Sequence, residues 1–209
     1  MTSKAGVHLN VLFGVLLAAA ALATSWAGFQ ASMWSSEQST HANRASRLRT
    51  SSTLATTRAG QQRLVDVQLF TSWLAAYAQQ DTRLAAFYEQ RFRPEFLPAF
   101  HAWVASRPLQ SRNAAPSPFA LPEYRLTEET EAQRLAHAAD DESAKSQHAN
   151  RVNDGYVFDA IILATVLFFG STAQQSAVTR MRLVLLGVAL MTCVVGVYRL
   201  LAAPLSWPS

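Results

Sequence analysis

Three long apolar segments without Asp, Glu, Lys or Arg limit the folds that this chain can adopt. The mean hydropathy of the 209 residues is only +0.06, so the chain as a whole is not strongly apolar. Its apolar residues are instead concentrated in blocks. The uncharged runs lie between Lys4 and Glu37, from Ala160 to Thr179 and from Leu183 to Tyr198. A helix that crosses a bilayer needs about 20 mainly apolar residues. We therefore predict transmembrane helices at about Val7–Gly28, Gly155–Ser171 and Leu183–Ala203.

The segment between the first two spans is polar, with 14 Lys or Arg and 13 Asp or Glu in residues 30–154. We expect an all-α membrane protein with three transmembrane helices and an antiparallel helical-bundle domain inserted between spans 1 and 2. The predicted parts are the N-terminus and first span (1–29), the bundle domain (30–154), the second span (155–172), a short basic loop (173–182), the third span (183–203) and a tail without expected structure (204–209).

The first apolar segment has two interpretations. Ala21-Leu22-Ala23 is similar to a signal-peptidase site, so a cleaved signal peptide is one alternative. The uncharged run continues past this site to Met33, which favours a retained helix. Small residues at helical spacing also allow close approach of a second helix in lipid, although an alanine-rich span without partner preference explains them equally well. These residues are Gly14, Ala18, Ala21 and Ser25.

Helix lengths predict a turn near Gly60. One helix over residues 31–92 would be roughly 93 Å long, whereas the returning helix over residues 126–154 would be about 44 Å long. A first limb over residues 31–59 would match the returning limb. Because Gly60 also follows weak helix formers, we expect a three-helix antiparallel bundle. Its third limb would bury an apolar stripe of Leu64, Val67, Phe70, Leu74, Tyr77, Leu84 and Phe87 or Tyr88.

Residues 91–124 hold six of the eight prolines and cannot continue a helix. We expect a proline-rich strap. A short interfacial helix over residues 95–106 would pack its aromatic side chains on the bundle base or on lipid headgroups. Residues 107–124 would then extend along the bundle. The candidate anchors of the strap are Arg91, Arg93, Glu95, Trp103 and Tyr124.

Opposite charges in two segments predict that the outer limbs of the bundle pair. Residues 37–63 carry five Arg and one Glu, whereas residues 123–142 carry seven acids and two Arg. Exposed pairs of this kind affect register and partner choice more than stability. The candidate interaction surface consists of Arg44, Arg47, Arg49, Glu128, Glu131 and Asp141.

Asp159 is the only acid within an apolar span, and such residues often mark ion or proton paths. A solvated carboxylate near the membrane surface is the alternative interpretation. Arg199, at the end of the third span, is positioned to pair with Asp159. His137, Asp141 and His148 share one helical face, but His137 and His148 lie roughly 16 Å apart, too far for one ion. We predict neither a metal nor a cofactor.

The placement of basic residues predicts the topology. Arg180 and Arg182 lie in the short connection between the last two spans, and Lys4 lies on the same side. Because short loops carry the positive-inside signal, we expect residues 30–154 to be extracytoplasmic. The aromatic residues Trp34, Tyr156, Tyr198 and Trp207 fall near one membrane face, as an interfacial belt requires.

The segments FQASMWSSEQ, RAGQQRLVDV, FYEQRFRPEFLPAFHAW and SPFALPEY resemble a family of uncharacterised bacterial three-span membrane proteins. The resemblance runs from the first span through the third, and RFRPEF.PAF.AW is its most specific part. It implies a bacterial inner-membrane protein with this layout. It implies no activity and no site residues.

Three classes of function fit these observations. The preferred hypothesis is a non-enzymatic, membrane-anchored interaction or scaffold protein that forms a homo-oligomer or binds another membrane protein. The second is a subunit of a channel or transporter, with Asp159 and Arg199 lining a path. The third is an envelope-directed enzyme, which would need a deep polar pocket near Glu95, His101 and Tyr124. A nucleic-acid binder is not expected, because residues 30–154 are nearly balanced in charge.

Overall fold

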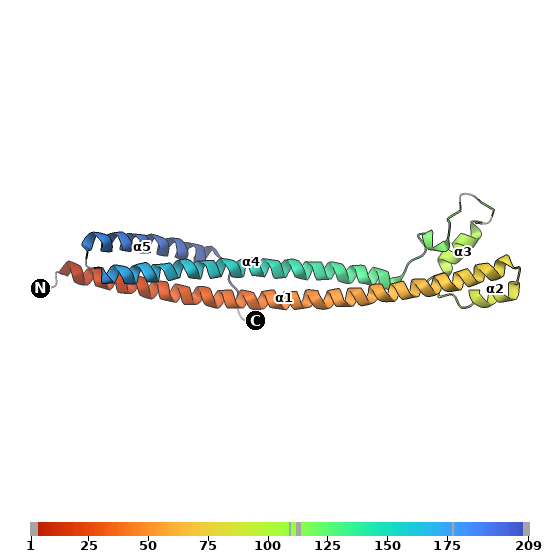
Figure 1. Cartoon of the computed structure of the whole chain (residues 1–209), viewed down its shortest axis with the longest axis horizontal. Helices are drawn as coiled ribbons and strands as arrows, with labels where there is room; N and C mark the ends of the chain where they lie inside the picture. Colours follow the sequence, from red (N-terminus) through yellow and green to blue (C-terminus); the bar gives the residue numbers. More distant parts are fainter. Residues whose placement is uncertain (1–3, 109, 112–113, 177, 207–209) are drawn as a thin grey trace. The chain divides into compact units, whose positions relative to one another are not determined.

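The computed structural model describes residues 4–108, 110–111, 114–176 and 178–206, and the regular structure of these residues is helical (Figure 1). In chain order the elements are α1 (Lys4–Ala78), α2 (Thr82–Glu89), α3 (Leu97–Ala105), the 3₁₀ helix η1 (Pro118–Ala120), α4 (Thr127–Gln175) and α5 (Thr179–Ala202). The helices α1, α4 and α5 are each long and apolar enough to cross a membrane. The prediction of an all-α chain with three such helices is confirmed.

The chain divides into two compact units. Unit 1 consists of Met1–Arg44 and Asp141–Ser209, and unit 2 consists of Ala45–Asp140. The long helices α1 and α4 contribute residues to both units, α5 belongs to unit 1, and α2, α3 and η1 belong to unit 2.

In unit 1 three helices pack around mostly small side chains, with α5 beside α1 and α4 (Figure 1). One buried cluster takes members from all three helices: Leu16, Ala20, Val166, Ala189 and Cys193. The helices α4 and α5 approach closely at Gly196, where an added Cβ would lie 2.9 Å from Leu163 Cδ2.

The outer surface of these helices carries large apolar side chains. Val15, Phe168, Met191 and Leu201 are all more than half exposed. Extensive apolar surface of this kind is unfavourable in water, whereas lipid removes the cost. Because helices satisfy their backbone groups internally, they are stable in lipid without further hydrogen-bond partners. Unit 1 is therefore compatible with a multi-pass membrane protein.

In unit 2 residues 45–78 of α1 lie antiparallel to residues 127–140 of α4. Ser52 Oγ donates a hydrogen bond to the carbonyl of Ala132 at 2.8 Å. Farther along α1, Arg63 Nη2 lies 3.2 Å from the carboxylate of Glu129, which comes earlier in α4. Small residues of α1 face this partner, since Ala55 and Ala59 are buried.

The helix α1 continues through Gly60, so the predicted turn there and the three-helix bundle that depends on it are wrong. A glycine in a helix interior costs about 1 kcal/mol relative to alanine. This cost is too small to break a helix of 75 residues. The helix ends at Ala78, and Gln80 then adopts a positive φ of 60°. The Asp81 carboxylate caps α2 by accepting a hydrogen bond from Leu84 N at 3.0 Å.

The apolar stripe predicted for this part of α1 is also partly wrong. Phe70 is buried as predicted, but Leu64 is 70% exposed. The buried face instead runs through Asp66, Phe70 and Trp73. Hydrophobic periodicity missed this face because one of its members is an acid.

The connection between the last two helices is shorter than the predicted loop over residues 173–182. The helix α4 passes through Gly155 without a break, as expected for a helix that continues into the second span. The helix ends at Gln175 and α5 begins at Thr179. Arg180 and Arg182 therefore lie in the first turn of α5, where we had predicted a loop.

Candidate functional site

A buried carboxylate joins α1 to residues 91–124 in unit 2. Asp66 has no exposed surface, and both of its carboxylate oxygens accept hydrogen bonds. Arg93 donates from Nε to Oδ1 at 3.0 Å and from Nη2 to Oδ2 at 2.8 Å. The hydroxyl of Tyr124 donates to Oδ2 at 3.0 Å. A planar guanidinium that binds a carboxylate through two nitrogens fixes geometry as well as contributing energy.

The surroundings hold these groups in the protonation states that the hydrogen bonds need. The hydrogen bond to Asp66 raises the pKa of Arg93 above its ordinary value. Burial, followed by the hydrogen bond to Asp66, raises the pKa of Tyr124 to about 12. Tyr124 is therefore a neutral donor at physiological pH, and Arg93 is a cation. Glu95 completes the cluster at 3.3 Å from Arg93 Nη1.

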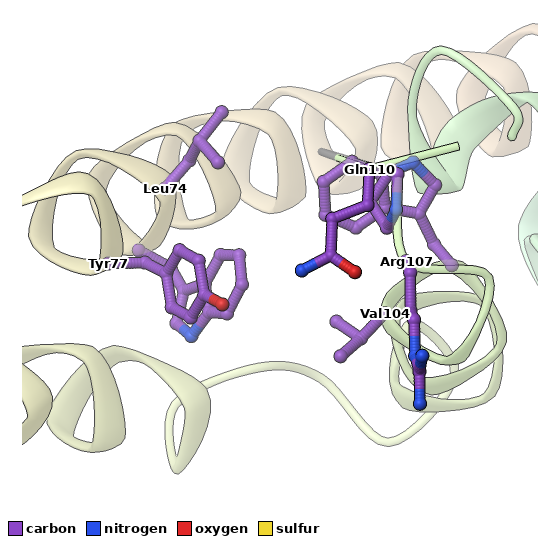
Figure 2. Close-up of a pocket in the computed structure, with 8 residues that line it drawn as sticks. Leu74, Tyr77, Val104, Arg107 and Gln110 are labelled. Carbon is purple, nitrogen blue, oxygen red and sulfur yellow. The ribbon is translucent and has the colours of Figure 1, made fainter. Parts of the chain in front are cut away.

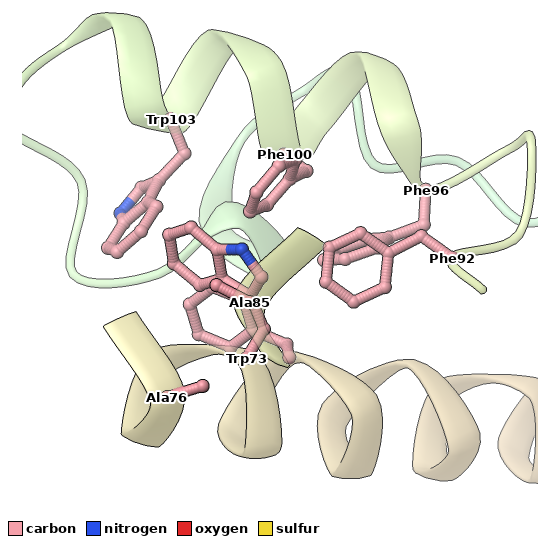
Figure 3. Packing of buried hydrophobic residues seen from close by; sticks show 8 residues of the cluster. Trp73, Ala76, Ala85, Phe92, Phe96, Phe100 and Trp103 are labelled. Atoms are coloured by element: carbon pink, nitrogen blue, oxygen red, sulfur yellow. The ribbon is translucent and has the colours of Figure 1, made fainter. Parts of the chain in front are cut away.

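An aromatic core lies beside this cluster (Figure 3). Phe100 meets the ring of Trp73 edge-on, with ring centroids 4.8 Å apart. Phe96 stacks on Phe119 at 5.2 Å. Edge-on and stacked ring pairs each contribute about 0.5–1.5 kcal/mol beyond the area they bury. The buried members of the core are Phe70, Trp73, Ala76, Ala85, Phe92, Phe96, Phe100 and Trp103.

This core corrects the predicted strap. Residues 97–105 form a short helix, α3, and Phe96, Phe100 and Trp103 are buried against α1, so of the two predicted placements the protein core is the one observed. Residues 114–124 do not run extended along a bundle. They fold back onto the same core, because Trp103 Nε1 donates to the carbonyl of Ala115 at 2.8 Å. Proline and aromatic residues together therefore make a compact cap on α1.

A small pocket opens between α1 and the end of α3 (Figure 2). Its volume is about 130 Å³. Ligand sites usually enclose about 300–1,000 Å³, so this pocket is smaller than a typical ligand site. Arg107, one of its lining residues, has a φ of 49°. Its backbone N–H donates to the carbonyl of Val104 just after the end of α3 at Ala105. The lining residues are Trp73, Leu74, Tyr77, Trp103, Val104, Arg107, Pro108 and Gln110.

Four of the five predicted strap anchors contact this region. Arg93, Glu95 and Tyr124 belong to the Asp66 cluster, and Trp103 belongs to the aromatic core. Arg91 lies apart, with its guanidinium carbon 3.4 Å from the ring centroid of Phe87.

Sequence reasoning missed Asp66, the residue that holds the cluster together. A signal was present, because Asp66 precedes Phe70 by four residues and Trp73 by seven and so shares their helical face. An acid on a face that is otherwise apolar indicates a buried partner.

Two of the three residues considered for an enzymatic site, Glu95 and Tyr124, belong to the Asp66 cluster. Glu95 pairs with Arg93, and Tyr124 packs against Phe96 and Phe119. His101 is exposed on α3.

The oppositely charged segments meet, although through fewer of the predicted residues than expected. Arg49 lies 3.6 Å from Asp140. Glu131 pairs with Arg134 on its own helix. No salt bridge among the described residues involves Arg44, Arg47, Glu128 or Asp141.

A second polar cluster lies in unit 1, where His41 contacts Glu142 at 2.6 Å and Glu37 at 3.5 Å. Lys145 also contacts Glu142, at 2.6 Å. The hydrogen bonds from His41 and from Lys145 lower the pKa of Glu142 from 4.5 to about 2. His148 packs edge-on against Trp34 nearby, with ring centroids 6.1 Å apart.

The predicted pair of Asp159 and Arg199 is present in unit 1. Arg199 Nε donates to Asp159 Oδ1 at 2.6 Å. Asp159 is 2% exposed. The Arg199 guanidinium also lies over the ring of Phe158, at 5.2 Å from its centroid. The pair joins α4 to α5 at one end of their apolar segments.

Residues 204–206 of the tail are held by hydrogen bonds, which corrects the expectation of no structure for this part of residues 204–209. Gln30, which has no exposed surface, donates to the carbonyl of Ser206 at 3.1 Å and accepts from its N–H at 3.0 Å. Trp34 Nε1 and the Tyr156 hydroxyl both donate to the carbonyl of Pro204. We call these contacts the tail clasp. Trp207, assigned to the predicted aromatic belt, lies outside the described residues.

Within the described residues, no group of three or more His, Cys, Asp or Glu side chains is placed to hold a metal ion. Comparison of the chain with protein-family models, with curated proteins and with solved structures gives no match. Its function is therefore inferred from the residues and contacts described above.

Proposed function

We propose that this chain is a membrane-anchored helical interaction protein that acts by self-association, without catalysis. The observation that carries the proposal is the small-residue face of α1. Gly14, Ala18 and Ala21 are all exposed in the single chain. An added Cβ on Gly14 would have no other heavy atom within 4 Å, so α4 and α5 leave this position uncovered.

A face of small residues allows two helix backbones to approach closely in lipid, where van der Waals contact drives helix association. The face lies within the apolar part of α1, so α1 of a second copy in the same membrane is the proposed occupant. Unit 2 would then be presented as two copies side by side, with the exposed charges around Arg49 and Asp140 selecting the partner. Another membrane protein with a similar face is the alternative occupant.

The proposed location is the bacterial inner membrane, with residues 30–154 outside the cytoplasm. The apolar outer surface of α1, α4 and α5 supports a membrane location. The resemblance to uncharacterised bacterial three-span proteins supports the bacterial membrane. The basic residues Lys4, Arg180 and Arg182 support the orientation.

The test compares two alanine-to-isoleucine variants of the full chain in mild detergent. Ala21→Ile adds bulk to the small-residue face and should shift the mass measured by light scattering from oligomer to monomer. Ala19 is also exposed but lies roughly 100° around the helix from Ala18 and roughly 160° from Ala21. Ala19→Ile should therefore leave the mass unchanged. A monomeric wild-type protein, or equal effects of the two variants, would contradict the proposal.

The buried Asp159 and its partner Arg199 favour a second candidate function, a subunit of an oligomeric channel or transporter. Ionisable residues at membrane depth often line ion or proton paths. Ion flux into liposomes that contain the protein, lost in Asp159→Asn, would support this function. A stable oligomer without flux would favour the interaction protein.

A further inference from the structure

A second surface feature of unit 1 carries an inference of its own. A pocket of about 310 Å³ opens between α4 and the end of α5. Its lining includes three charged side chains, which are Arg151, Asp159 and Arg199. Two cations and one anion give the lining a net charge of +1.

The two arginines are not equally engaged. Arg199 uses Nε to bind Asp159, and its side chain remains 44% exposed. Arg151 is exposed and forms no hydrogen bond or ion pair within the part of the chain that the structure describes. The nearby carboxylate of Asp154 accepts a hydrogen bond from Asn150 instead. Arg151 is therefore a free cation beside a half-exposed one.

The position of the pocket along the helices indicates the kind of anion. Arg151 precedes the apolar segment of α4 by a few residues, and Arg199 follows the uncharged run of α5 that ends at Tyr198. Both cations thus mark the same end of two antiparallel spans. Tyr198, which lines the pocket, is 73% exposed, and Leu201 and Phe158, which adjoin lining residues in the chain, are more than half exposed. Polar headgroups and acyl chains meet at this depth of a bilayer.

We propose that this pocket binds the phosphate group of an anionic phospholipid. Arg151 and the free edge of the Arg199 guanidinium would bind the phosphate oxygens, since arginine matches their geometry. The acyl chains would lie along Phe158 and Leu201. Basic pockets between transmembrane helices suit acidic headgroups in this way. The inference rests on the membrane anchoring proposed above, but not on self-association, so a monomeric chain would still bind the lipid.

The experiment measures lipids retained by the purified full chain in native mass spectrometry. Wild-type protein should retain phosphatidylglycerol in preference to phosphatidylcholine, which carries no net charge. Arg151→Gln should reduce phosphatidylglycerol retention by about fivefold, as expected from about 1 kcal/mol per basic residue. Arg180→Gln makes the same charge change at an exposed site at the other end of α5 and is the matched control, with retention unchanged.

A variant of opposite sign separates binding from loss of structure. Asp159→Asn removes the anion that neutralises Arg199 and raises the net charge of the lining to +2, so it should increase phosphatidylglycerol retention. Glycerophosphate and inorganic phosphate are the soluble competitors. If neither compound displaces the lipid, the result supports a lipid site. If either compound displaces the lipid at equal concentration, the pocket is assigned to a soluble phosphate. Equal retention of the two lipids by the wild type, or equal effects of Arg151→Gln and Arg180→Gln, would overturn the proposal.

Discussion

Asp66 is a charged residue in a place where a charge is stable only with a partner. Its carboxylate has no exposed surface, and Arg93 and Tyr124 bind it from two other parts of unit 2. Such a pair adds little net stability when it is complete, but removal of one partner leaves a buried charge uncompensated. The cluster therefore determines where residues 91–124 sit on α1 more than it adds to stability.

Arg93→Met should destabilise unit 2 by about 3–5 kcal/mol. The double variant Asp66→Asn/Arg93→Met should recover part of the loss, because no unpaired charge remains. Denaturant unfolding followed by tryptophan fluorescence measures both effects, since Trp73 and Trp103 lie in the adjoining core. The matched control is Arg91→Met, which removes only a stacking contact with Phe87 and should cost below about 1 kcal/mol. Similar losses of unfolding free energy in Arg93→Met and Arg91→Met would show that Arg93 does not stabilise the buried Asp66 carboxylate.

Tyr124→Phe should cost about 1–3 kcal/mol, because the hydrogen bond to the Asp66 carboxylate is lost. The wild type should also lose stability at alkaline pH. The pKa of Tyr124 is raised from 10.0 to about 12, so the stability from its neutral form is complete below pH 10 and is lost between pH 10 and pH 12. Melting temperatures measured across this window should fall in the wild type more than in Tyr124→Phe. Parallel pH profiles of the two proteins would contradict this role.

The lowered pKa of Glu142 predicts that unit 1 loses stability at acid pH, whereas the raised pKa of Tyr124 predicts a loss at alkaline pH. Its pKa is lowered from 4.5 to about 2 by the hydrogen bonds from His41 and Lys145. The stability from its ionised form is therefore complete above pH 4.5 and is lost as the pH falls from 4.5 to 2. Glu142→Gln should flatten this part of the profile in thermal unfolding. Glu128→Gln, which removes a carboxylate without an ion pair among the described residues, should not.

At the scale of elements, a substitution at Gly60 distinguishes a continuous helix α1 from two helices joined by a turn. In a continuous helix its replacement by alanine should stabilise the protein by about 0.5–1 kcal/mol. No heavy atom lies within 4 Å of the added Cβ, so no clash opposes the gain. Circular dichroism during heating measures the change, and a loss of stability in Gly60→Ala would indicate a turn. The contrast is Gly196→Ala, where the Cβ would meet buried Leu163 at 2.9 Å and should destabilise by about 1–3 kcal/mol.

The segment over residues 91–124 illustrates what sequence patterns predict about an element. The helices α1 and α2 end at Ala78 and Glu89, before its first proline, and the short helix predicted over residues 95–106 lies within two residues of α3 at both ends. The direction in which its aromatic side chains face was left open between the protein and lipid headgroups. Phe96 and Trp103 would suit headgroups or a protein core equally well, and only Phe70 and Trp73 of α1 decide between them.

At the scale of the whole chain, the tail clasp brings the C-terminal residues back to the first helix. Truncation after Ala203 should lower the melting temperature of the detergent-solubilised protein. It would leave the buried amide of Gln30 without partners, at a cost of about 1–3 kcal/mol. Gln30→Leu combined with the truncation should restore part of the stability, because no polar group then stays unsatisfied. Truncation without effect would show that the clasp contributes nothing to unit 1.

The sequence by itself determined that the chain is helical and that three helices are apolar enough to span a membrane. Both properties are local, because a helix satisfies its own backbone and hydropathy is read residue by residue. Tertiary structure alone decided that Asp66 is buried and that residues 204–206 are clasped. Those outcomes depend on partners 27, 58 and 176 residues away in the sequence, as for Arg93, Tyr124 and Ser206. A local pattern carries no information on contacts at such separations, since the free energy that fixes them arises only when the chain has folded.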